Sequence, residues 1–94
     1  HATPELRIEC PDTLKFDTMS RIHDHVLGTK DADDVNVIDG VRVRSGGGLW
    51  LVRASNTEEA LVARAEAASE SELDSLLTQL EGALAAAGLD WHRP

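Results

Sequence analysis

The chain opens with a strict alternation of charged and apolar residues over positions 5–10, Glu-Leu-Arg-Ile-Glu-Cys. A period of two is typical of a β-strand whose two faces lie in different surroundings. Leu6, Ile8 and Cys10 would share the buried face, and the three charged side chains would share the exposed one. The pattern therefore predicts a half-buried strand at the start of the fold.

Two later segments carry apolar residues three and four positions apart, which is the spacing of an amphipathic helix. The first covers about residues 13–27, follows candidate N-cap residues at positions 11–13 and ends before Gly28. Its apolar stripe consists of Phe16, Met19, Ile22, Val26 and Leu27. The second helix begins with a capping box formed by Ser69 and Glu72 and ends at Gly88. Its stripe consists of Leu73, Leu76, Leu77, Leu80, Ala83, Leu84 and Ala87.

Short apolar runs separated by turn residues predict four further strands between the two helices. Asp39-Gly40 is typical of a tight type I′ turn, and the glycines at positions 46–48 are typical of a flexible hairpin tip. The first three of these strands would therefore pair as antiparallel hairpins. The predicted strands cover residues 35–38, 41–44, 49–54 and 61–67.

The strand over residues 49–54 has no purely polar face. Leu51 and Arg53 lie on one side, and Trp50 lies on the other. We expect Leu51 to meet the helices and Trp50 to lie on the outer face of the sheet, near a neighbouring domain of a longer protein. Trp50 as a core residue is an equally good interpretation of the same pattern.

Two amphipathic helices need one apolar sheet face to cover, which favours an α+β fold. We predict a two-layer sandwich, in which an antiparallel sheet of about four main strands is covered on one face by two helices. A chain of 94 residues is expected to form a single domain, residues 1–94, around one core.

The chain is acidic, with a formal net charge of −8. This charge repels phosphodiester backbones and anionic lipid surfaces, so we expect neither nucleic-acid binding nor membrane binding. No apolar run approaches the roughly 20 residues of a membrane span. Cys10 is the only cysteine and cannot form an internal disulfide, which fits a reducing compartment and a cytoplasmic protein.

The sequence lacks the residue patterns of a metal site or a catalytic nucleophile. His23 and His25 are two positions apart on a predicted helix, so they point to different sides. We find no Cys/His ligand spacing, nucleophile elbow or plausible triad. We therefore predict no catalytic residue and no metal ligand in this chain.

Residues 53–58, Arg-Ala-Ser-Asn-Thr-Glu, carry the most distinctive chemistry and lie between two strand-like runs. Arg53 presents a planar fork of donors that matches a phosphate edge, and Ser55, Asn56 and Thr57 add short donors. Free main-chain amides in such a turn can form an anion-binding nest. On composition alone, a polar loop between strands is the preferred interpretation, because Ser, Asn and Thr are common turn residues, and phosphate binding is the alternative.

Four segments in a fixed order carry a resemblance to a known family. They are Thr3 to Ile8, Asp39 to Arg44, Leu51 to Glu58 and Leu61 to Glu66. Together they resemble the C-terminal domain of the phosphohexomutases, and they are most similar to the bifunctional phosphomannomutase/phosphoglucomutase group. The resemblance spans nearly all of the 94 residues, and the ordered series is more specific than any one motif.

The resemblance implies a TATA-box-binding-protein-like fold and a role in binding a phosphosugar. Four residues would contact the phosphate that is not reacting, namely Arg53, Ser55, Asn56 and Thr57. Glu58 and Arg44 would support them. The family loop usually continues with Pro at or near the next position, whereas this chain has Glu59-Ala60. This departure concerns the stiffness of the loop and leaves its donors intact.

A complete phosphohexomutase has four domains, and the resemblance implies that this chain is the fourth, separated from the rest. The phosphoserine loop, the magnesium loop and the sugar-selecting loop of the family are not found in this sequence. We therefore expect a part of a phosphoglucomutase/phosphomannomutase that is inactive by itself. Magnesium and glucose 1,6-bisphosphate are implied as cofactors of the full-length enzyme, with none in this domain. The implied partners are glucose or mannose 1- and 6-phosphates and the other domains of the same chain.

A second hypothesis comes from a different class of function. The chain would be a non-catalytic protein-interaction module that binds its partner through Trp50 and the outer sheet face. A third hypothesis, nucleic-acid binding, is disfavoured by the net charge.

Overall fold

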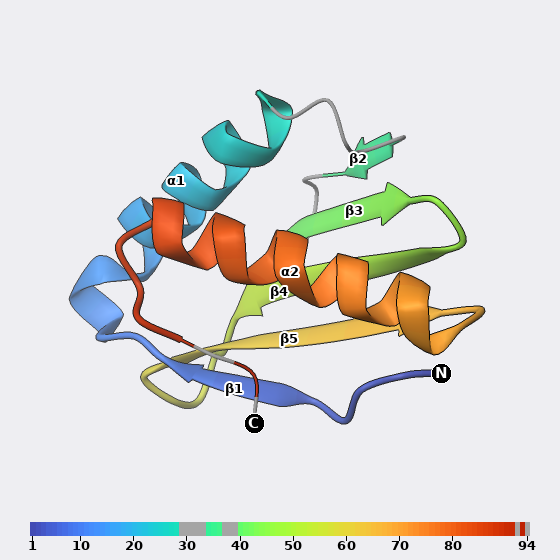
Figure 1. Ribbon diagram of the computed structural model, residues 1–94. Helices are drawn as coiled ribbons and strands as arrows, with labels where there is room; N and C mark the ends of the chain where they lie inside the picture. Colours follow the sequence, from blue (N-terminus) through green and yellow to red (C-terminus); the bar gives the residue numbers. More distant parts are fainter. Residues whose placement is uncertain (29–33, 37–39, 92, 94) are drawn as a thin grey trace.

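The computed structural model describes residues 1–28, 34–36, 40–91 and 93. These residues form a five-stranded antiparallel sheet with two α-helices packed on the same face (Figure 1). The elements are β1 (Leu6–Glu9), a 3-10 turn η1 (Asp12–Leu14), α1 (Lys15–Leu27), β2 (Asp34–Asn36), β3 (Val41–Ser45), β4 (Gly48–Ala54), β5 (Ala60–Ala67) and α2 (Glu70–Ala86). The predicted α+β two-layer architecture is confirmed.

The strand order in the sheet is β1-β5-β4-β3-β2. The first strand of the chain therefore pairs with the last, and β2 to β5 follow one another as neighbours. β2 is a short edge strand of three residues, which overlaps the strand predicted over residues 35–38. Residues 37 and 38 of that prediction lie outside the described residues. The predicted Asp39-Gly40 turn lies partly outside the described residues, which include Gly40 but not Asp39.

Alternation along β4 determines which side chains form the core. Trp50 is 1% exposed and Val52 is equally buried, and both lie on the face that the helices cover. Trp50 Nε1 also donates a hydrogen bond to Gln79 Oε1 of α2 at 3.2 Å. The expectation that Trp50 lies on the outer face is therefore wrong, and the interaction module hypothesised from Trp50 loses its central residue.

The physical reason lies in the residues that share a face with Leu51. Arg42 and Arg64 flank Leu51 in the register of β3, β4 and β5, and both arginines are exposed. Burying this face would remove guanidinium groups from water at a high cost. Burying the opposite face removes the indole of Trp50 from water, which is favourable because an aromatic side chain buries about 150–250 Å².

The core stripe of α1 differs from the predicted one. Thr18, Ile22 and Val26 are buried at intervals of four residues, and Met19 is partly buried beside them. Phe16 is 92% exposed and Leu27 is 59% exposed, so their assignment to the apolar stripe is wrong. A helix turns about 100° per residue, which places Phe16 on nearly the opposite side from Thr18. The predicted side-chain N-cap is also absent, because Leu14 occupies the N-cap position without a capping hydrogen bond.

The second helix agrees with its prediction. Ser69 Oγ accepts a hydrogen bond from Glu72 N at 3.1 Å and donates one to Glu72 Oε1 at 3.2 Å. These two bonds cap the N-terminus of α2. At the other end Gly88 has a φ of 89°, and Leu89 N donates to Leu84 O at 2.9 Å. This left-handed glycine is the usual helix terminator.

The described residues that follow α2 fold back onto the body of the domain. Trp91 packs against the core, and Arg93 Nε donates to Glu81 Oε1 at 3.2 Å. The hydrogen bond with Glu81 raises the pKa of Arg93 above its ordinary value. Neither of the two α-helices among the described residues is long and apolar enough to span a membrane.

Ser69→Ala is expected to lower the free energy of unfolding by about 1 kcal/mol, because the amide of Glu72 loses its capping partner. Urea denaturation followed by circular dichroism measures this loss. Ser71→Ala is the matched control, since Ser71 is an exposed serine two residues further along at the same helix start. Equal stability of the two variants would contradict the capping role.

Candidate functional site

The predicted site residues lie where β4 leaves the sheet beside the start of α1. Arg53 is the penultimate residue of β4, and residues 55–59 form the β4–β5 loop. An open groove of about 1030 Å³ runs between this loop and α1. Its lining residues are Asp12, Lys15, Phe16, Met19, Ser20, His23, Gly40, Val41, Arg53, Ala54, Ser55 and Asn56. The groove thus brings Arg53, Ser55 and Asn56 together, whereas Thr57 belongs to the loop but does not line the groove.

Ser55 organises the loop through its own hydrogen bonds. Its Oγ accepts from Thr57 N at 3.3 Å and from Glu58 N at 3.2 Å, and its own N–H donates to Ala60 O at 2.9 Å. These are local turn bonds of the kind that serine favours. A hydroxyl oxygen has two acceptor positions and one hydrogen. The hydrogen of Ser55 therefore remains available to donate to a ligand.

The same bonds limit what the main chain of the loop can offer. The amides of Ser55, Thr57 and Glu58 already donate within the protein, so they do not form a nest of successive free N–H groups. The amide of Asn56 makes no hydrogen bond with any described residue. Anion binding at this loop therefore depends on side chains and on one main-chain amide.

Arg53 is exposed and forms no hydrogen bond or ion pair with any described residue. The side chains of Asn56 and Thr57 are likewise exposed and have no hydrogen-bond partner among the described residues. Five consecutive residues therefore carry a guanidinium, an amide and two hydroxyl groups whose donor hydrogens are free. Such a set can surround the oxygens of a phosphate, with the guanidinium in a bidentate contact.

Lys15 holds the loop from the side of α1. Its Nζ donates to Ser55 O at 2.7 Å and also to Glu58 O. A third bond joins Nζ to the carboxylate of Asp12, and the Lys15 side chain is only 12% exposed. Sequence reasoning missed Lys15, because the two loop oxygens that it binds are 40 and 43 residues away in the chain.

Glu58 turns away from the groove and toward β1. Arg7 Nε lies 2.9 Å from Glu58 Oε2, and this hydrogen bond raises the pKa of Arg7 above its ordinary value. Glu59 accepts from Cys10 N through its main-chain oxygen at 3.0 Å. Its side chain accepts from Asp12 N at 3.3 Å. The end of the loop is thus tied to β1 and to the segment that follows it.

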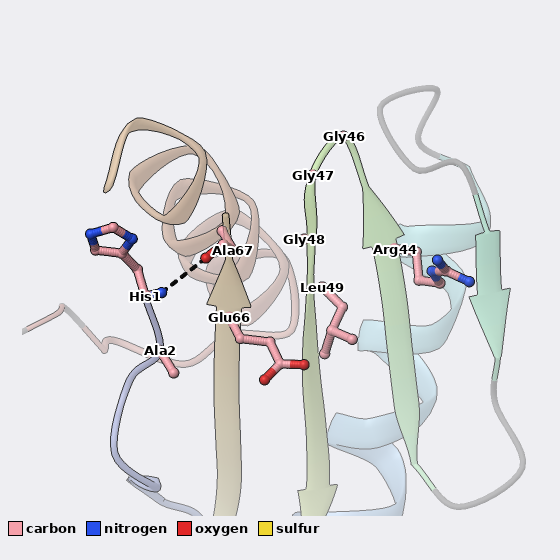
Figure 2. A pocket seen from close by; sticks show the side chains of 9 residues that line it. All are labelled: His1, Ala2, Arg44, Gly46, Gly47, Gly48, Leu49, Glu66 and Ala67. Atoms are coloured by element: carbon pink, nitrogen blue, oxygen red, sulfur yellow. Dashed lines mark hydrogen bonds between the residues drawn. The ribbon is translucent and has the colours of Figure 1, made fainter. Parts of the chain in front are cut away.

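Arg44 does not join the loop and is not a supporting residue of this groove. It pairs with Leu49 next to the Gly46-Gly47 turn, at the other end of the β3–β4 hairpin from Arg53. Leu49 and Arg53 are four positions apart in β4, or about 13 Å along the strand. Figure 2 shows Arg44 beside a second hollow, where its side chain points away from Glu66.

Two further arginines lie on the outer sheet face with Arg53. Arg42 and Arg64 lie on either side of Leu51, and Arg53 lies two residues further along β4. Of these three arginines, only Arg53 lies next to the β4–β5 loop, because the strand register places the other two further along the sheet.

The groove also contains residues of α1 that the sequence did not indicate as site residues, Phe16, Ser20 and His23. Phe16 fitted the predicted apolar stripe of the helix, so nothing in the sequence indicated that its side chain would be exposed. Within the described part of the chain, no group of three or more His, Cys, Asp or Glu side chains is arranged to hold a metal ion.

Comparison with known proteins places this geometry in a family. Residues 5–83 match the family described as phosphoglucomutase/phosphomannomutase, C-terminal domain. A phosphomannomutase/phosphoglucomutase from Pseudomonas putida is 40% identical over 79 residues, which are 80% of this chain and 16% of that protein. The protein of the same name from Pseudomonas aeruginosa is 36% identical over 89 residues, which are 90% of this chain and 18% of that protein.

A solved structure agrees with the sequence relatives. The crystal structure of a phosphoglucomutase/phosphomannomutase family protein from Burkholderia thailandensis superimposes with a TM-score of 0.77 at 32% identity. The superposition covers 96% of this chain and 19% of that chain. This chain therefore spans less than a fifth of the length of these relatives. It belongs to the family of phosphoglucomutase/phosphomannomutase C-terminal domains.

Proposed function

We propose that this chain is the phosphate-binding domain of a phosphomannomutase/phosphoglucomutase. Arg53 and the β4–β5 loop would hold the phosphate of a phosphosugar at the end that is not reacting. The observation that carries this proposal is the unengaged guanidinium of Arg53 beside a loop with free hydroxyl and amide donors. Family membership supplies the class of ligand, because the relatives are named as phosphosugar mutases.

Each donor has a distinct task in this proposal. Arg53 would contact two phosphate oxygens with its planar fork, which adds both charge and geometry. The hydroxyl of Ser55 and the amide of Asn56 line the same groove and would reach the remaining oxygens. Thr57 would contact the phosphate from the outer side of the loop. All four residues act by binding and positioning, and none of them is required to transfer a proton.

Recognition through the phosphate alone suits a mutase. A 1-phosphate and a 6-phosphate interconvert through a bisphosphorylated sugar. Each of its two phosphates must therefore be able to occupy the same binding site. A loop that contacts phosphate oxygens and ignores the sugar accepts both orientations. Closing this loop over the ligand would also exclude water from the reacting phosphoryl group.

The chemistry of phosphoryl transfer is assigned to other parts of a longer protein. Magnesium would neutralise charge on the transferring group there, and glucose 1,6-bisphosphate would supply the phosphoryl group. No residue of this chain is proposed to ligate the metal. We therefore expect no mutase turnover from the 94 residues by themselves.

Titration of the isotope-labelled chain with glucose 1-phosphate tests the proposal. We expect amide shifts concentrated at residues 53–58 and a Kd on the order of 1 mM, near −4 kcal/mol, because most of the mutase site is missing. Inorganic phosphate should move the same amides, whereas glucose should move none of them. Shifts spread over the outer sheet face, with residues 53–58 unmoved, would contradict this assignment.

A further inference from the structure

We propose that Lys15 is the positioning residue that sets the binding conformation of the β4–β5 loop. The inference rests on the proposed function of that loop, and it names a residue from a different element of the fold. Lys15 lies at the first position of α1, 40 residues before Ser55 in the chain. Lys15 would therefore act on the loop through a tertiary contact, in which it binds main-chain oxygens of the loop.

The hydrogen bonds of Lys15 define this role. An ammonium group has three hydrogens, and Lys15 Nζ has three acceptors, namely Ser55 O, Glu58 O and the carboxylate of Asp12. No hydrogen is left for a ligand, although Lys15 lines the same groove as Arg53. Lys15 would thus act on the ligand through the loop, and direct contact with phosphate belongs to Arg53 and its neighbours.

The two loop oxygens that Lys15 binds are three residues apart and bracket Asn56 and Thr57. One ammonium group bonded to both oxygens fixes the distance between the two sides of the turn. The Ser55 hydroxyl makes the inner bonds of the same turn, to the amides of Thr57 and Glu58. Together these bonds leave Asn56 and Thr57 at the tip, with their side chains exposed.

Further anchors act only on the far end of the loop. Arg7 binds the carboxylate of Glu58, and Cys10 N and Asp12 N bind Glu59. Among the described side chains outside the loop, Lys15 is the one that joins the Ser55 end to the Glu58 end by hydrogen bonds. Removing it would leave the partly buried oxygen of Ser55 and the exposed oxygen of Glu58 without this donor. The entropic cost of ordering the loop would then reduce the affinity for the ligand.

Lys15→Met tests this inference, because methionine keeps a similar length and removes all three hydrogen bonds. Two quantities are measured on the 94-residue chain. The first is the heteronuclear NOE of the Asn56 and Thr57 amides without ligand, and the second is the Kd for glucose 1-phosphate and for inorganic phosphate. We expect the NOE of both amides to fall, and both ligands to bind about five- to tenfold more weakly. Unchanged NOE values with a Kd within about twofold of the original would overturn the proposal.

Lys15→Arg separates positioning from charge, and it also gives a result if the Met variant fails to fold. A guanidinium keeps the positive charge, but its planar donors do not match three acceptors arranged around an ammonium. If Lys15 positions the loop, the affinity should fall together with the NOE of Asn56 and Thr57. Full affinity with a disordered loop would show that only the charge matters and would refute positioning.

Arg21→Gln is the control for loss of a cation from α1. Arg21 forms an ion pair with Asp17 at 3.0 Å on the exposed side of the helix. It makes no hydrogen bond or ion pair with the described residues of the loop. Its replacement should leave the loop NOE and both affinities unchanged. If the original chain bound neither ligand, the proposed function would fail, while the loop NOE of the Lys15 variants would still decide what Lys15 does.

Discussion

Arg53→Ala is expected to weaken the binding of glucose 1-phosphate and inorganic phosphate by about 10- to 100-fold. The physical reason is the loss of a bidentate, charge-assisted contact, since hydrogen bonds to charged groups contribute about 1.5–3 kcal/mol each. No internal ion pair is broken, because Arg53 has no such partner among the described residues. The variant should therefore keep its stability while it loses its ligand. Amide shifts at residues 54–58 measure the loss of affinity, and urea denaturation measures the stability.

Arg64→Ala is the matched control for this experiment. Arg64 is an exposed arginine on the neighbouring strand β5, it faces the same side of the sheet, and it pairs with Leu51. Its removal changes the net charge as much as Arg53→Ala does, but it lies outside the groove. A similar loss of affinity in both variants would mean that a diffuse positive face attracts the anion. In that case the proposed phosphate-binding site at the β4–β5 loop would be refuted.

Trp50→Ala is expected to lower the free energy of unfolding by about 3–5 kcal/mol. Trp50 is the largest fully buried side chain, and it lies between the sheet and α2. Truncation would leave a large cavity and would also remove the donor that binds Gln79 Oε1 at 3.2 Å. A loss of this size is a large part of the stability of a small domain, which is typically about 5–15 kcal/mol. Urea denaturation of both proteins provides the measurement.

Leu51→Ala is the control, because Leu51 is the next residue of β4 and points to the opposite face of the sheet. It is only partly buried, so its truncation should cost about 1 kcal/mol or less. If Leu51→Ala were the more damaging change, the helices would cover the other face of the sheet. The interaction hypothesis for Trp50 would then return.

The β4–β5 loop shows how the fold positions the candidate site. Antiparallel pairing of β4 with β5 brings Ala54 opposite Leu61, so the residues between them must turn within a short distance. β1 pairs with the other side of β5 and brings Arg7 and Glu9 to the same end of the sheet. The chain then passes directly into α1, which places Lys15 against the loop. The strand order β1-β5-β4 is therefore what surrounds the loop with its anchors.

Part of the candidate site could be predicted from the sequence because its residues are close together in the chain. Arg53, Ser55 and Asn56 are neighbours, and a loop between two strands brings their side chains into one groove. Lys15 and Arg7 could not be predicted as loop anchors, since they are 40 and 51 residues away from the groups that they bind. Arg44 shows the converse, because a motif that lies near Arg53 in sequence falls at the other end of the hairpin.

The kinds of the secondary structure elements and their approximate boundaries follow from the amino-acid pattern alone. A period of two in the strands, a period near 3.6 in the helices, and the Ser69 cap are local properties, and local backbone geometry responds to them directly. The packing of distant elements was needed to establish which face of β4 is buried and that Phe16 lies on the exposed side of α1. These outcomes depend on how strands and helices distant in sequence share one core, and burial there favours Trp50 over a face that carries exposed arginines.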